Sequence, residues 1–553
     1  MYRLIIVVFT LMFAYQYSYS AEDRFQQKVV YEIDVRLDDQ QQMLHGYEVI
    51  HYTNHSPDLL EVIYLHLWPN AYRNNRTTLA REQFELEGKH HLFNIPSQRG
   101  YIDSLDFRVN QQPVDWDYHP EHLDIGRLKL NEPLEPGETI TITTPFRVKI
   151  PLAVTSRLGY VDQSYKISHW YPKPAVYDQN GWNLISYQDQ ADFYSEFGAY
   201  KVNITLPENY VVAATGVLVT ESERKWLNEK ARRTNQKLGF NVFDTEIPIS
   251  SPNEKTIQYE ADTALDFAWF ADKRYHVLKK DFRIPQSGRN VTSSVFFTNE
   301  QAELWLDANA YVESVLQRFS GWYGAYPYET YSVVLGAPGS QNKAMGYGNL
   351  SSVGYVASSG QLEQAIVKTA SKAWFSSLLH FNEYHFPFMD EGLSEFSEVR
   401  YFSVPGQEPM KFYEYYDIKE GVARFLGIDH LDFYAEQDLK YVFNARRNLD
   451  QPTRTTTKQL SRVNKYAVAE AKSAKAFMHL MHYLGERQFD QVLRSFISKW
   501  KFSHVQPTDL QPFFRSKTGK KLDWFFQELL ENDQTVDYAL RKHKNGRLLV
   551  KNK

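Results

Sequence analysis

The first half of the sequence alternates between apolar and polar residues over short runs. Between residue 29 and about residue 261 these runs include VVYEIDVRL, YEVIHYT and TITITTPFRVKI, and turn residues separate them. A period of two places alternate side chains on opposite faces of a strand, while Pro, Gly and Asn between the runs are typical of turns. The pattern predicts antiparallel sheets that each pack one face against a core.

Further along the chain the pattern changes to a helical period. Apolar residues recur at helical spacing from 300 to 323, and helices dominate from residue 361 onward. Short strands are predicted at 332–335, 352–356 and 547–550, and a short solvated helix at 221–237. This change places a domain boundary near residue 275. The chain is predicted to be α+β, with a β-rich domain at 21–275 and a mostly helical domain at 276–553.

Composition and charge limit the kinds of protein that this chain can be. Hydrophobic residues make up 43% of the 553 residues, which is ample for packed cores in two or more domains. The net charge is −5, from 62 Lys and Arg against 67 Asp and Glu. This nearly balanced surface gives no reason to expect a nucleic-acid partner.

The first 20 residues have the pattern of a secretory signal peptide. Arg3 precedes a mostly apolar run from Leu4 to Ala14, and Ser18-Tyr19-Ser20 provides a small-x-small cleavage signal. The apolar run is too short to span a membrane, so no integral span is expected after cleavage. The chain contains no Cys, which excludes disulfides and thiolate metal sites. We therefore expect an exported protein of the bacterial periplasm or cell envelope, or a secreted one.

The stretch from 367 to 398 resembles a zinc peptidase site that lacks its ligands. The template is H-E-x-x-H on a helix, where two His hold zinc and the Glu activates water. Lys368, Thr369 and Lys372 occupy those three places. Glu391 follows Lys372 by 19 residues, which is the spacing expected for a third ligand on a second helix.

With these motifs, the chain resembles the membrane alanyl aminopeptidase family of gluzincin zinc metallopeptidases. Trp374-Phe375 and Asp390-Glu391-Gly392 match the family's segments after the second His and around the ligand Glu. The resemblance covers nearly the whole mature chain. It implies a saddle-like β domain followed by a thermolysin-like domain of the catalytic type.

The resemblance also assigns a role to other positions, and most of them depart from the family. Ala344, Met345, Gly346 and Tyr347 fall on the edge-strand segment that lines the substrate groove, where Gly346 replaces a Glu. Glu470 falls where the family has a Tyr that steadies the tetrahedral intermediate, unless Tyr466 reaches in from one turn earlier. Glu398 falls where the family keeps a carboxylate behind the ligand Glu.

These substitutions remove the chemistry of a metallopeptidase. An ammonium group has no lone pair, so Lys368 and Lys372 are poor metal ligands, and Thr369 cannot act as a general base near neutral pH. No metal or other cofactor is therefore expected. We predict instead that the two ammonium groups occupy the place of the metal and bridge to Glu391, with Glu470 and Glu398 as further partners. Two cations then balance Glu391 and Glu470. The alternative is that both lysines point into water.

Three functions remain open from the sequence. The first is a non-catalytic pseudopeptidase that binds a peptide or a partner protein in the former active-site groove. The second is an active zinc aminopeptidase whose metal is held by a non-standard set of residues. The third is a structural envelope protein with a vestigial groove. Metal analysis together with an aminopeptidase assay separates the first function from the second.

Overall fold

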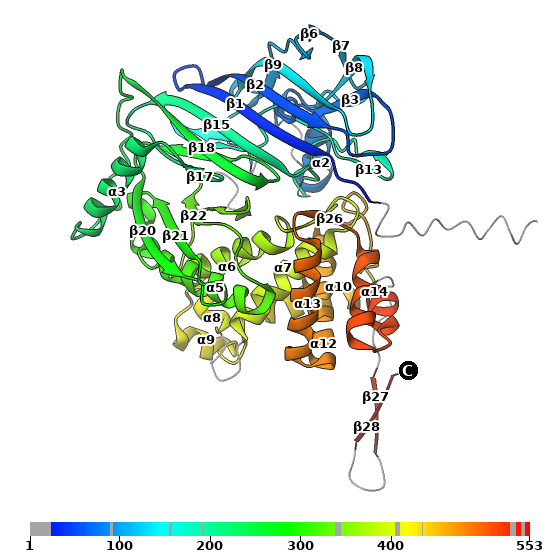
Figure 1. Cartoon of the computed structure of the whole chain (residues 1–553). Helices are drawn as coiled ribbons and strands as arrows, with labels where there is room; N and C mark the ends of the chain where they lie inside the picture. The colour runs from blue at the N-terminus through cyan, green and yellow to red at the C-terminus, as the bar shows by residue number, and fades with distance from the viewer. Residues whose placement is uncertain are drawn as a thin grey trace, which may run out of the picture.

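The computed structural model describes residues 24–88, 92–153, 157–190, 193–337, 344–403, 410–433, 435–530, 538–542 and 548–552. The predicted signal peptide at 1–20 lies outside these residues. The chain has a β-rich N-terminal part and a mostly helical C-terminal part, as the change of period predicts. Figure 1 shows the large N-terminal sheet above the helices of the second part.

A nine-stranded sheet dominates the N-terminal part. Its order is β17-β18-β15-β1-β2-β9-β5-β6, with β4 also paired to β9, and β1 and β15 are its parallel pair. The alternation seen in the sequence reappears as alternating burial along β1, where Tyr31, Ile33 and Val35 face the core. The strands are β1 (Lys28–Asp38), β2 (Met43–Thr53), β4 (Tyr101–Asp103), β5 (Arg108–Val109), β6 (Gln112–Pro113), β9 (Thr139–Lys149), β15 (Gly198–Pro207), β17 (Val217–Leu218) and β18 (Glu254–Ala264).

Smaller sheets and short helices complete this part. One sheet has the order β10-β11-β19-β16, another has the order β12-β3-β8-β7, and β13 pairs with β14. The predicted helix at 221–237 is α3 (Glu221–Asn235). The other elements are β3 (Leu60–His66), η1 (Trp68–Tyr72), α2 (Thr78–Glu87), η2 (Pro96–Gln98), β7 (Asp115–Tyr118), β8 (Ile125–Leu134), β10 (Gly159–Val161), β11 (Ser164–Ile167), β12 (Lys173–Pro174), β13 (Tyr177–Asp178), β14 (Gly181–Trp182), β16 (Val211–Ala214) and β19 (Trp269–Asp272).

A five-stranded sheet opens the C-terminal part and ends at a two-residue edge strand. Its order is β20-β21-β22-β24-β23. The predicted helix at 300–323 is interrupted around Leu306 and Asp307 and forms η3, α4 and α5. The elements are β20 (His276–Arg283), β21 (Asn290–Phe297), η3 (Asn299–Gln301), α4 (Ala302–Trp305), α5 (Ala308–Tyr323), β22 (Thr330–Leu335), β23 (Met345–Gly346) and β24 (Leu350–Val353).

Helices make up most of the remaining chain, and α6 packs directly against α7. The predicted stripe on Phe477 and Leu480 lies on α12, and the predicted last strand is β28. The elements are α6 (Ser359–Phe375), β25 (Leu379–Phe381), α7 (Pro387–Phe402), α8 (Phe412–Tyr415), α9 (Glu420–Leu426), α10 (Ala435–Arg446), α11 (Arg462–Asn464), the π-helix η4 (Lys465–Lys472), α12 (Ser473–Leu484), α13 (Glu486–Trp500), β26 (Ser503–Val505), α14 (Pro507–Thr518), the π-helix η5 (Trp524–Leu529), β27 (Tyr538–Lys542) and β28 (Leu548–Asn552).

Two hydrophobic cores hold these parts together. One core draws on residues 29–271, and the other extends to residue 530. The second core also takes Leu227 and Ala231 from α3, together with Val211 and Phe270 from the small N-terminal sheet. The boundary near residue 275 stays a prediction. Within the described ranges, no helix combines the length and the hydropathy that a membrane crossing needs.

Candidate functional site

Two packed helices bring the residues singled out in the sequence together. Helix α6 starts after Ser358, whose hydroxyl accepts a hydrogen bond from Gln361 N and so caps the helix. Lys368 and Lys372 lie four residues apart and therefore share one face of α6. Helix α7 starts with Pro387 at its first position, which is a favoured place for proline. Its residues 391, 395 and 398 recur at helical spacing along the face that meets α6.

Lys368 lies between two carboxylates from different elements. Its Nζ is 2.7 Å from Glu470 Oε2 on η4 and 3.2 Å from Glu395 Oε2 on α7. Both glutamate side chains are nearly buried. Glu470 belongs to a π-helix, a form that is rare in proteins and frequent at functional sites. The ammonium group therefore joins three elements that lie up to 102 residues apart in the sequence.

Lys372 makes the second set of ion pairs, one turn further along α6. Its Nζ is 3.0 Å from Asp390 Oδ2 and 3.6 Å from Glu391 Oε2. A third cation, Lys465, has its Nζ 3.9 Å from the other oxygen of Glu391 and 3.8 Å from Glu383 Oε1. Glu391 is thus held between two ammonium groups.

The partners differ in part from those expected from the sequence. Glu391 pairs with Lys372 and not with Lys368, while Glu470 pairs with Lys368 as predicted. Glu398 makes no ion pair with either lysine among the described residues; its Oε1 accepts a hydrogen bond from Gln364 Nε2 at 2.9 Å. The sequence predicts a set of two cations and two carboxylates, and the structure adds further charged residues to this set. Asp390, Glu395 and Lys465 belong to the cluster as well.

The geometry raises the pKa values of three members of the cluster, Lys368, Glu398 and Glu470. Burial disfavours the charged form of Lys368, but the carboxylates of Glu470 and Glu395 outweigh it and raise its pKa well above the ordinary value. Burial, reinforced by Glu395, raises the pKa of the Glu398 carboxyl well above its ordinary value. Burial also raises the pKa of Glu470, although Lys368 works against this shift. Lys368 therefore keeps its proton and its positive charge, while Glu398 and Glu470 release their protons less readily than an exposed carboxyl group does.

Thr369, which the sequence resemblance aligns with a general base, forms a hydrogen bond within its own helix. Its hydroxyl donates to the carbonyl of Ala365 at 2.8 Å, and the side chain is buried. This is a common arrangement for a helical Thr. The residue therefore has neither the chemistry nor the orientation of a group that takes a proton from water.

The edge strand β23 packs directly onto α6. A Cβ atom at Gly346 would lie 2.9 Å from Lys372 Cβ and 2.9 Å from the carbonyl oxygen of Thr369. Real Cβ atoms do not approach other atoms so closely, so this backbone position accepts only glycine without movement. Position 346 is thus closed against the helix that carries the two lysines.

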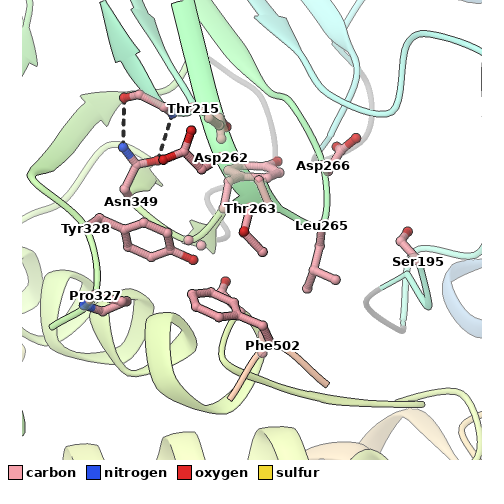
Figure 2. A pocket seen from close by; sticks show the side chains of 18 of the residues that line it. Ser195, Thr215, Asp262, Thr263, Leu265, Asp266, Pro327, Tyr328, Asn349 and Phe502 are labelled. Carbon is pink, nitrogen blue, oxygen red and sulfur yellow. Dashed lines mark hydrogen bonds between the residues drawn. The ribbon is translucent and has the colours of Figure 1, made fainter. Parts of the chain in front are cut away.

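Two cavities border β23, and Met345 and Gly346 line both of them. The first, here called the site cavity, has a volume of about 550 Å³ and also includes Ala344. The cluster residues that line it are Lys368, Thr369, Lys372, Glu391, Lys465, Tyr466 and Glu470. The second, here called the interdomain cavity, has a volume of about 530 Å³, includes Tyr347 and is shown in Figure 2. The predicted groove segment therefore lies at the junction of the two cavities.

The side chains at the site do not fit a zinc ion. Zinc in proteins takes Cys, His, Asp or Glu ligands, and here two of the three expected ligands are ammonium groups that are already paired with carboxylates. Across the part of the chain that the structure describes, no group of three or more His, Cys, Asp or Glu residues is placed to hold a metal ion. We derive no reaction step through a metal at this site.

Comparison with solved structures identifies the class of fold. The chain is similar to an M1 zinc metallopeptidase from Deinococcus radiodurans, with 15% identity, a TM-score of 0.59, and coverage of 92% of this chain and 94% of that one. A mutant of that enzyme gives 16% identity, a TM-score of 0.58 and coverage of 92% and 95%. The same enzyme's mutant bound to a Tyr-Ser-Ala substrate gives 14% identity and a TM-score of 0.54.

The likeness to M1 zinc metallopeptidases extends over nearly the whole of both chains and agrees with the sequence resemblance. At 14–16% sequence identity, this likeness shows that the chains share a fold. No family model matches the sequence, and no curated protein does either. The chain therefore has an aminopeptidase-like scaffold.

Sequence reasoning missed several members of the cluster. Glu395 could have been found, because it lies one turn after Glu391 and one turn before Glu398 on the same face of α7. Asp390 is next to Glu391 and was named only as part of a motif. No sequence pattern indicates that Lys465 and Glu383 belong to the cluster. The two residues lie 82 positions apart, and a contact over that separation produces no periodic pattern.

Proposed function

We propose that this chain is an exported aminopeptidase-like protein that does not hydrolyse peptides and that binds an extended polypeptide, either a peptide or a segment of a partner protein, in the site cavity. One observation carries the proposal. Lys368 and Lys372 fall where the sequence resemblance puts two family ligands, and the ammonium group of each is within 3.0 Å of a carboxylate oxygen. An ammonium nitrogen has no lone pair to offer a metal, and without a metal this cluster has no Lewis acid to polarise water.

The edge strand supports binding of an extended polypeptide. β23 is the last strand of its sheet, and among the described strands it pairs only with β24. An extended segment can add to such an edge through main-chain hydrogen bonds. Tyr415 and Tyr466, which also line the cavity, offer ring surfaces to its side chains. Since Gly346 has no carboxylate, this mode does not require a free amino terminus.

An activity assay tests the catalytic half of the proposal. The chain is incubated with zinc and a panel of aminoacyl and peptidyl fluorogenic substrates, with and without a chelator. We expect no chelator-sensitive hydrolysis. The matched comparison is the triple variant Lys368→His, Thr369→Glu, Lys372→His, which restores the family residues on α6. Chelator-sensitive hydrolysis by the unchanged chain would favour the alternative of a working metallopeptidase.

A binding assay tests whether the chain binds an extended polypeptide in the site cavity. A fluorescent library of extended peptides is titrated with the chain and with the variant Tyr466→Ala, which removes one ring from the site cavity. We expect a subset of peptides to bind and the variant to weaken their binding about fivefold, since a ring stacked on a ligand contributes roughly 1 kcal/mol. Tyr47→Ala, at an exposed tyrosine on β2, is the matched control. Equal weakening by both variants, or no binding at all, would contradict the proposal.

A further inference from the structure

The interdomain cavity lies between the two parts of the chain and borders the cluster of lysines through Asp390. Residues 260–266 at the end of β18 line the cavity, together with Tyr328, the segment 345–349 and Phe502. Figure 2 shows the rings of Tyr328 and Phe502 bordering the same space as Asp262, Thr263 and Leu265. Its volume of about 530 Å³ is in the range of small-ligand sites.

The lining of this cavity is rich in carboxylates, but not all of them are available to a ligand. Asp266 Oδ1 is 3.1 Å from Lys173 Nζ and Oδ2 is 3.0 Å from His169 Nδ1. Asp390 is paired with Lys372. These two carboxylates are neutralised inside the protein.

Three other carboxylates remain exposed on the rim. Asp262 and Glu329 have no ion pair or side-chain hydrogen bond within the described residues, and Glu260 has only a 3.4 Å hydrogen bond from Gln258. Among the described residues of the lining, Arg289 is the single Arg or Lys, and its guanidinium donates to the carbonyl of Pro327. The rim therefore keeps an excess of negative charge.

The histidines of the lining do not offset this charge. His380 Nε2 accepts a hydrogen bond from Ser195 N at 3.1 Å, so this nitrogen carries no proton. Burial lowers the pKa of His169 below its ordinary value. Both side chains are nearly enclosed by protein.

Rings and one buried hydroxyl complete the site. Phe193, Tyr328 and Phe502 present aromatic surface to the cavity, and such surface attracts cations. Ser195 is only 2% exposed and lines the cavity, yet its hydroxyl has no hydrogen-bond partner among the described residues. This hydroxyl is therefore available to a group bound in the cavity.

From these features we propose that the interdomain cavity binds a cationic group, a guanidinium or ammonium carried on a short carbon chain. Asp262 and Glu329 pair with the charge, the rings of Tyr328 and Phe502 cover the carbon chain, and Ser195 Oγ accepts a hydrogen bond from the cation. Such a group is either a free small amine or the Arg or Lys side chain of a polypeptide. The proposal stands independently of the role of the site cavity.

Isothermal titration calorimetry with matched probes tests this inference. The first pair is Nα-acetyl-arginine amide and Nα-acetyl-citrulline amide, which have nearly the same shape and differ in charge. We expect the arginine probe to bind at least about tenfold more tightly, because a charge-assisted pair is lost in citrulline. Agmatine and a five-residue peptide with a central Arg form the second pair. Tighter binding of the peptide identifies a polypeptide side chain as the source, and equal binding identifies a small amine.

Variants of the rim locate the binding. Asp262→Asn and Glu329→Gln are each expected to weaken the arginine probe about tenfold, and Ser195→Ala to weaken it less. Glu303→Gln, at an exposed glutamate on α4 outside the cavity, is the matched control and should change nothing. Equal binding of arginine and citrulline probes, no binding of either, or unchanged affinity in both Asp262→Asn and Glu329→Gln would overturn the inference.

Discussion

At the level of single residues, the charge of Lys368 offsets the burial of several carboxylates. Its Nζ contacts Glu470 and Glu395, and Glu398 is fully buried nearby. Burial raises the pKa of both Glu398 and Glu470, so their charged forms are tolerated only with a cation close by. Removing that cation leaves negative charge in the interior, which is a costly change.

The variant Lys368→Met should therefore destabilise the protein in a pH-dependent way. We expect a loss of about 3–5 kcal/mol in the free energy of unfolding at pH 8, the usual cost of breaking a buried pair. A carboxyl whose pKa is raised in the folded state holds its proton there after the unfolded chain has released it. Stability therefore falls as pH rises above about 4.5, and the loss should be smaller at pH 5. Urea unfolding at the two pH values measures it.

Glu398→Gln is the control for this prediction, because it removes a buried carboxyl and keeps the acceptor for Gln364. We compare the unfolding free energy of this variant with that of the unchanged chain. The difference should favour the variant more at pH 8 than at pH 5. A loss for Lys368→Met that is equal at both pH values would contradict the assignment of charge in this cluster.

Among individual residues, the chemistry was easier to predict than the partners. The sequence identified Lys368, Lys372 and Glu391 from motif spacing, because spacing along one helix is fixed by its geometry. Which lysine meets which carboxylate depends on how α6, α7 and η4 lie against each other. That arrangement depends on side chains far apart in the sequence, so the sequence alone left it open.

At the level of elements, the close contact between β23 and α6 shapes the site. Gly346 allows the strand backbone to approach the carbonyl of Thr369 and the side chain of Lys372. The neighbouring Met345 pairs with Ser352 of β24 and keeps the strand in its sheet. The site cavity and the interdomain cavity meet along this strand.

The variant Gly346→Ala should push the strand away from the helix. We expect it to cost about 1–3 kcal/mol of unfolding free energy, as overpacking in a close contact does. Gly421→Ala on α9 is the matched control, because a Cβ atom there meets nothing within 4 Å. This control should be neutral or slightly stabilising. Equal thermal denaturation curves for both variants would show that the contact is looser than described.

The existence of the long elements was predicted better than their ends. The strands of the N-terminal sheet and helix α12 follow from periodicity, because each buries one face, while α6 and α7 follow from the motif template. The predicted helix at 300–323 breaks in two, and the predicted strand at 352–356 is β24 at Leu350–Val353. The π-helical form of η4 had no signature in the sequence.

At the level of the whole molecule, Asn349 ties the two parts of the chain together. Its Nδ2 donates to Gly216 O at 2.9 Å, and its Oδ1 accepts from Gly216 N at 3.0 Å. Figure 2 shows this pair of hydrogen bonds at the edge of the interdomain cavity. Gly216 has a φ of +87°, and a Cβ atom there would collide with the carbonyl of Glu260. The N–H and the carbonyl of Gly216, in the N-terminal part, are therefore both bonded to one side chain of the C-terminal part.

The variant Asn349→Leu should weaken this junction. It leaves the N–H and the carbonyl of Gly216 without their partner, at a cost of about 1–3 kcal/mol for each unsatisfied group that stays buried. We expect a lower thermal midpoint and faster hydrogen exchange around 214–218 and 328–332. Asn349→Asp, which keeps the acceptor, should lose less. Unchanged exchange in both segments would contradict the role of this contact.

We expect lysine ammonium groups, and no metal, at the centre of this scaffold. The most direct test of this expectation is the zinc content of the purified full chain after incubation with excess zinc and desalting, measured by inductively coupled plasma mass spectrometry. We expect zinc at the level of a buffer blank. One zinc ion per chain that is removed by a chelator and lost in a Glu391→Gln variant would contradict it.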